Sequence, residues 1–224
     1  MKSKALITSL VLAFSLLFLA TSPAVLAADH LALVRVAHLS PDAPAVDIWV
    51  DGSVVLSEVP FKTVSDYLEL PEGSHRIQVS PAGETSPIVI DATVQLEADT
   101  AYTVAATGLL GEDDLSPLVL VDDLFNYCEN SKVRFVHTSP DAPAVDVGPS
   151  DGSVLFGDVA FRGASEYAKL PAGTYDLEVR VAGTMDIALV IPDVTIEAGT
   201  NYTVFAIGKL GDGTLAALPV VDES

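Results

Sequence analysis

Hydrophobic and polar residues alternate through most of the chain with the period of two that is typical of β-strands. Residues 75–80 and 175–180 alternate cleanly, and residues 202–207 are mostly β-branched or aromatic before the run ends at Gly208. Asp-Gly pairs and Pro-x-Gly triplets separate such runs, and both are typical of turns. After the first 27 residues no window of 12 or more carries a helical stripe. The pattern therefore predicts an all-β protein.

The chain also contains a long internal repeat. Residues 34–47 recur as residues 133–146, with 11 of 14 positions identical, and the offset of 99 becomes 100 after one inserted residue. A constant offset over such a length indicates two copies of one fold. Roughly seven or eight short strands per copy, with turns every 8–12 residues, predict two tandem Greek-key β-sandwich domains. We place them at residues 31–122 and 132–222, with a linker over 123–131.

Two tyrosines occupy the same place in each copy. Tyr102 and Tyr202 each follow a turn and open a strand. That placement predicts a tyrosine corner, in which the phenol hydroxyl bonds back to the preceding turn.

The N-terminus has the features of a signal peptide. Lys2 and Lys4 precede an apolar run, and small residues precede a break after Ala27. We expect residues 1–27 to be removed and the protein to be secreted, either extracellular or at the cell surface, or periplasmic if the envelope has two membranes. An uncleaved membrane anchor is the alternative. No later stretch is long and apolar enough to span a membrane.

Charge and cysteine content narrow the partners. Without the signal, 31 acids face nine bases, which gives a formal charge of −22. Such a surface repels phosphate and argues against nucleic acid and anionic membranes; it also fits a high-salt habitat. The single cysteine, Cys128, excludes an internal disulfide framework and a thiolate zinc site. In an oxidising compartment Cys128 could form a disulfide with a second chain and so link a dimer.

The repeated His-x-Ser-Pro-Asp segment is the first place to look for catalysis. His38 and Ser40 share a strand face, as do His137 and Ser139. However, the proline after each serine has no N–H for an oxyanion hole, and the G-x-S-x-G pattern is absent. We favour a structural interpretation, in which histidine continues an apolar face and a rigid turn follows. It covers His38, Ser40, Asp42, Asp47, His137, Ser139, Asp141 and Asp146.

Two further features are candidates for binding. Trp49 is predicted to face outward between Asp47 and Asp51, where it could stack on a sugar or enter a partner's pocket. Alternatively it covers the other domain or a sheet edge. The run Glu112, Asp113 and Asp114 is a candidate calcium site. The second copy keeps only Asp212 there, and adjacent acids are expected by chance in so acidic a chain.

The repeated motif resembles the hallmark of a prokaryotic family, domain of unknown function 4397. Residues 34–47 and 133–146 carry it, together with 70–73, 170–173 and 198–204. The resemblance implies an exported bacterial or archaeal protein with immunoglobulin-like or transthyretin-like sandwiches. The family has no established catalytic residues, so none is carried over.

From these observations we expect a non-catalytic binding or structural module at the cell envelope or in the extracellular matrix, and not an enzyme. Its expected partner is an extracellular protein or polysaccharide, and it needs no cofactor. A calcium-dependent adhesion or matrix protein is the alternative, and an enzyme using the His-x-Ser-Pro-Asp segment is less favoured.

Overall fold

The computed structural model describes residues 30–125 and 130–223. The predicted signal peptide and Cys128 lie outside the described residues. Among the described residues, no helix has the length and apolarity needed to cross a membrane.

The first repeat folds into two facing four-stranded sheets. One sheet has the order β4-β1-β7-β8 and the other the order β3-β2-β5-β6. The β1–β7 pair is parallel, and the other pairs are antiparallel. A short 3₁₀ turn, η1 (Leu110–Glu112), joins β7 to β8. The strands are β1 (Leu31–His38), β2 (Val46–Val50), β3 (Ser53–Val59), β4 (Leu68–Pro71), β5 (Gly73–Pro81), β6 (Ile90–Leu96), β7 (Ala101–Thr107) and β8 (Ser116–Asp122).

The second repeat has the same two sheets. Their orders are β12-β9-β15-β16 and β11-β10-β13-β14, and β9 and β15 are the parallel pair. The strands are β9 (Ser131–His137), β10 (Val145–Pro149), β11 (Phe156–Val159), β12 (Ala168–Leu170), β13 (Gly173–Val181), β14 (Ile187–Ile196), β15 (Asn201–Ile207) and β16 (Ala216–Val221).

Alternation along the strands builds one core inside each sandwich. In β2, Ile48 and Val50 point inward and pair with Val79 and Ile77 of β5. In the second repeat Phe135 stacks on Phe156, with ring centroids 6.4 Å apart. The predicted tyrosine corners are also present, since the Tyr102 hydroxyl accepts the Glu97 N–H, and Tyr202 has the equivalent bond.

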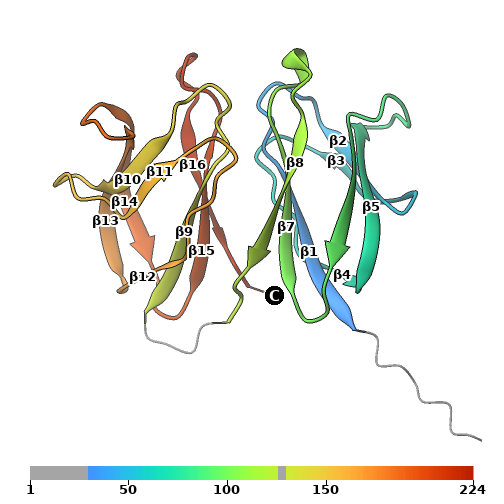
Figure 1. Cartoon of the computed structure of the whole chain (residues 1–224), viewed down its shortest axis with the longest axis horizontal. Helices are drawn as coiled ribbons and strands as arrows, with labels where there is room; N and C mark the ends of the chain where they lie inside the picture. Colours follow the sequence, from blue (N-terminus) through green and yellow to red (C-terminus); the bar gives the residue numbers. More distant parts are fainter. Residues whose placement is uncertain (1–29, 126–129, 224) are drawn as a thin grey trace, which may run out of the picture.

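The sheet that holds β1 in the first repeat packs against the sheet that holds β9 in the second (Figure 1). A third apolar cluster joins them, and it includes Leu39, Ala105, Leu120, Phe205 and Ile207. The molecule is therefore a stack of four sheets, with the sheets of β2 and β10 outermost. The prediction of an all-β chain with two tandem sandwiches is confirmed.

Candidate functional site

The two motif histidines are buried at the ends of β1 and β9. His38 is 1% exposed, and its Nε2 lies 3.0 Å from the carbonyl oxygen of Pro44. His137 is 0% exposed and lies 2.9 Å from the Pro143 oxygen in the same way. Each imidazole therefore links the end of its strand to the turn that follows.

The first motif aspartate of each copy binds backbone N–H groups of the loop after the seventh strand. Asp42 accepts from Leu110 and Gly111, both at 2.8 Å. Asp141 accepts from Leu210 at 2.7 Å and Gly211 at 2.8 Å. Partial burial acts to raise the pKa of both carboxyls, but these hydrogen bonds outweigh it and lower the pKa.

The second motif aspartate joins two hairpins of its outer sheet. Asp47 accepts the N–H groups of Glu58 and Gly83, both at 2.8 Å. In the second repeat Asp146 accepts from Asp158 at 2.7 Å and from Gly183 at 2.8 Å. The two motif carboxylates in each copy thus hold loops that are far apart in sequence.

The serines of the motif are not bonded to the histidines through their hydroxyls. Ser40 Oγ donates to Asp42 at 3.2 Å, and Ser139 Oγ donates to Asp141 at 3.3 Å. His38 Nδ1 has no hydrogen-bond partner among the described residues, and His137 Nδ1 accepts the backbone N–H of Ser139. A serine nucleophile needs a base within reach of its hydroxyl. This geometry instead supports a structural role for the motif.

Burial of the motif histidines makes folding stability depend on pH. Burial lowers the pKa of both His38 and His137, and the bonds to proline carbonyls only partly offset it. The unfolded chain therefore takes up protons first as pH falls. The free energy of unfolding is expected to be highest above about pH 7 and to fall as pH drops below the unfolded histidine pKa of about 6.5.

Urea unfolding at about pH 8 and about pH 5.5 measures this effect. The double variant His38→Gln/His137→Gln is expected to be less stable at the higher pH and to lose less stability at the lower one. An equal loss in the double variant and the unaltered chain would contradict the assignment.

The predicted calcium residues lie in and after η1. Asp113 ends the turn with a left-handed backbone, at φ 54°. The Asp114 carboxylate lies 3.2 Å from Arg162 of the second repeat. No group of three or more His, Cys, Asp or Glu residues able to hold a metal occurs in residues 30–125 and 130–223. The calcium site at Glu112, Asp113 and Asp114 therefore stays a prediction, with no ligand set to support it.

Trp49 lies on the outer face of the first repeat, away from the second. Its indole Nε1 donates to Ser80 Oγ on β5 at 3.0 Å. The strand register places Trp49 in one row across the sheet, which runs from Val54 on β3 through Trp49 to Gln78 on β5 and Asp91 on β6. The interpretation in which Trp49 covers the other domain is wrong, because the sheet of β2 is the outermost layer.

Hydrogen bonds between side chains fix the orientation of the polar groups in and beside this row. Arg76 binds both oxygens of Asp91, through Nε at 2.8 Å and Nη2 at 2.5 Å. The Gln78 amide also donates to Asp91, at 3.3 Å. We call Val54, Trp49, Arg76, Gln78 and Asp91 the Trp49 face. Sequence reasoning found only Trp49, and the alternation in β5 was the available signal for Arg76 and Gln78.

The second repeat has no equivalent face. Gly148 stands where the first repeat has Trp49, and a Cβ there would lie 2.0 Å from the Ser153 carbonyl oxygen. Arg180, at the position of Ser80, lies beside it and donates to the Ser153 carbonyl at 2.6 Å. With Arg180 only 1% exposed, the space above Gly148 is filled. The candidate site is therefore present in one repeat.

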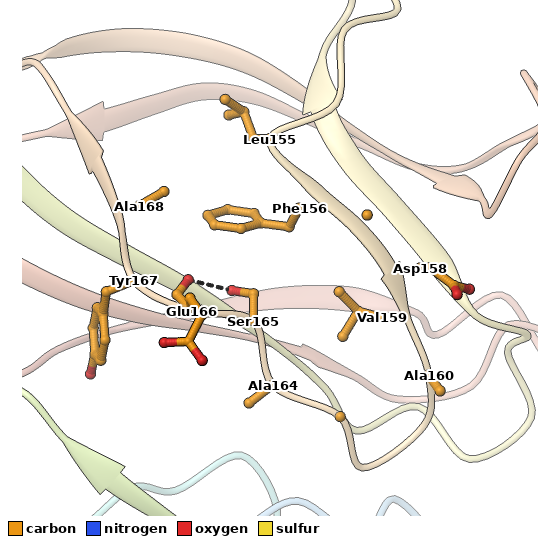
Figure 2. A pocket seen from close by; sticks show the side chains of 12 residues that line it. Leu155, Phe156, Asp158, Val159, Ala160, Ala164, Ser165, Glu166, Tyr167 and Ala168 are labelled. Carbon is orange, nitrogen blue, oxygen red and sulfur yellow. Dashed lines mark hydrogen bonds between the residues drawn. The ribbon is translucent and has the colours of Figure 1, made fainter.

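A hollow of about 520 Å³ opens at the side of the second sandwich, between β11 and β12 (Figure 2). Its apolar lining includes Phe156 and Val159. Ser165 Oγ, its central polar group, donates to the Glu166 carbonyl at 2.9 Å and accepts the N–H of Phe135. The only hydroxyl donor of Ser165 is therefore used within the fold. On the Trp49 face, Gln78 uses one amide N–H for Asp91 and keeps its amide oxygen and second N–H for a ligand, so we regard that face as the better candidate.

The architecture defines a class, that of paired β-sandwich modules built from a tandem repeat. The chain belongs to the family described as "Domain of unknown function (DUF4397)", whose profile matches residues 32–148 and again residues 131–224. The family resemblance of the repeated motif is thus confirmed. No curated protein matches the chain. Among solved structures, "The Bacillus anthracis TIE protein" is similar at 13% identity and a TM-score of 0.26, over 80% of this chain and 34% of that one. The chain thus spans about a third of that protein's length.

Proposed function

We propose that the chain is an exported, non-catalytic module that binds a neutral polysaccharide on the Trp49 face, at the cell envelope or in the surrounding matrix. The observation that carries this proposal is the row that places Trp49 beside Gln78 and Asp91 on an outer sheet. The export part rests on the signal-like N-terminus.

The chemistry of the Trp49 face suits a sugar chain. An indole offers a flat apolar surface with a polar tip, and the apolar face of a pyranose ring stacks on such a surface. The Gln78 amide and the Asp91 carboxylate supply donors and acceptors for hydroxyl groups. The net charge of −20 disfavours an anionic polysaccharide. A neutral glycan is therefore the expected ligand.

The same face is poorly suited to cleaving that glycan. Glycoside hydrolysis uses two carboxyl groups, and one of them needs a raised pKa to act as an acid. The hydrogen bonds from Arg76 instead lower the pKa of Asp91. Asp91 is thus held as an acceptor, which favours binding over hydrolysis.

Affinity electrophoresis in gels that contain laminarin, galactomannan or glycogen tests the proposal. At least one of these neutral polysaccharides is expected to retard the unaltered chain, and alginate is the anionic comparison. Trp49→Ala is expected to weaken binding at least about tenfold, because buried aromatic contacts dominate such interfaces. Trp49 lies outside the sandwich core, but it is half-buried and its indole bonds Ser80, so a modest fall in melting temperature is also expected.

Met185→Ala is the matched control. Met185 is 69% exposed and belongs to the second repeat, so retardation should persist when it is truncated. Equal retardation of Trp49→Ala and the unaltered chain, or no retardation in any of the neutral gels, would contradict the proposal.

A further inference from the structure

The same Arg–Asp ion pair forms in both directions across the interface between the repeats. Arg35 of β1 donates to Asp222 at 2.5 Å and to the Val221 carbonyl at 3.0 Å. Arg134 of β9 binds Asp122 and the Val121 carbonyl of the first repeat in the same way. All four charged side chains are at most 4% exposed. The interface is therefore isologous in form, as in a two-fold symmetric dimer.

Each repeat also holds its own arginine through contacts within that repeat. Arg35 Nε donates to Thr103 at 2.8 Å, and its guanidinium lies 4.9 Å from the ring of Tyr67. Arg134 makes the same two contacts with Thr203 and Tyr167, at 2.9 Å and 4.9 Å. Groups fixed within one repeat lose little freedom on association.

The receiving carboxylates are fixed in the same way. Asp122 accepts from Tyr67 and Thr103, both at 2.6 Å. Asp222 accepts from Tyr167 and Thr203, both at 2.8 Å. Each repeat thus carries a preformed donor and a preformed acceptor, so the polar register alone would also allow two like repeats to pair.

The apolar part of the interface is unequal, and this breaks the symmetry. The equivalent positions 105 and 205 hold Ala105 and Phe205, both 0% exposed and in the same cluster. Two second repeats would bring two phenylalanines into that cluster, and two first repeats would leave it underfilled. Overpacking and cavities are both destabilising. The packing therefore favours one repeat of each type.

We propose that this face is a recognition surface that pairs a first repeat with a second repeat whether or not the two belong to the same chain. The Arg–Asp register sets the geometry, and the Phe205/Ala105 difference selects the unlike repeat. The connecting segment is then not needed for pairing, and two copies exchange repeats when the segment is cut. This inference is independent of polysaccharide binding.

The test uses the whole chain with a protease site inserted within residues 126–129. After cleavage, the two halves are expected to co-elute as one species. Light and isotopically heavy cut chains are then mixed and followed by native mass spectrometry. Exchange should yield complexes in which a light first repeat is joined to a heavy second repeat, or the reverse. These should outnumber complexes of two first repeats or two second repeats by at least about tenfold. Halves that separate, halves that never exchange, or like pairs as abundant as unlike pairs would overturn the proposal.

Substitutions at positions 105 and 205 test whether the Phe205/Ala105 difference selects the unlike repeat. Ala105→Phe should separate the cut halves, and adding Phe205→Ala should restore pairing because the phenylalanine has only changed sides. Met185→Phe, which adds the same ring at an exposed position, should leave pairing unchanged. If a variant does not fold, the exchange of unaltered halves still decides the proposal.

Discussion

Replacing Arg35 by methionine is expected to lower the free energy of unfolding by about 3–5 kcal/mol, the usual cost of removing one partner from a buried ion pair. Asp222 would stay buried without its cation, and the Val221 carbonyl would lose a donor. Both losses fall on the interface between the repeats, so the contact between the two sandwiches should be weakened. Urea unfolding followed by circular dichroism measures the change.

The matched control is Arg76→Met, which removes an exposed Arg–Asp pair. Arg76 and Asp91 are 59% and 42% exposed, and exposed ion pairs contribute little to stability. Arg35→Met/Asp222→Leu should recover part of the loss, because an apolar pair replaces a lone buried charge. An Arg35→Met variant as stable as Arg76→Met would show that the buried pair does not hold the repeats.

Replacing Phe135 by alanine is expected to cost about 3–5 kcal/mol, the range for truncating a buried phenylalanine. Phe135 is 2% exposed and stacks on Phe156 in the core of the second sandwich. The first repeat has Val36 and Leu56 at the equivalent positions. Phe135→Val is therefore expected to cost less than Phe135→Ala.

The residues of the first repeat at these two positions provide a control for the core of the second repeat. Phe135→Val/Phe156→Leu reproduces the pair that the first repeat uses, so it should be less harmful than Phe135→Ala alone. Thermal and urea unfolding should agree on that order. A loss under about 1 kcal/mol for Phe135→Ala would contradict the packing described for the second repeat.

The fold was predictable because its signals are local. Alternation in residues 75–80 and 175–180 indicated strands with one buried face, and the turn residues between such runs indicated where strands end. The repeat then required two copies of whatever fold these strands build. The outward position of Trp49 followed from the same period of two, since Ile48 and Val50 face the core.

The interface between the repeats was not predictable, because it depends on how the two sandwiches pack against each other. Alternation places Arg35 and Arg134 on the face opposite the sandwich core, but it does not show what covers that face. Both are buried instead, because each binds the aspartate at the end of the last strand of the other repeat. Asp222 lies 187 positions from Arg35, and Asp122 lies 12 positions from Arg134. No local pattern reports such a pairing. The row from Trp49 to Asp91 likewise needed the pairing of β5 with β6.

The most direct test of the account uses the only tryptophan in the chain. Trp49 is that tryptophan, so intrinsic fluorescence reports on the Trp49 face alone. Titration with the neutral polysaccharide that retards the chain most is expected to change the emission in a saturable way, with a midpoint that matches the gel affinity. Retardation without any change in tryptophan emission would place binding elsewhere and contradict the account.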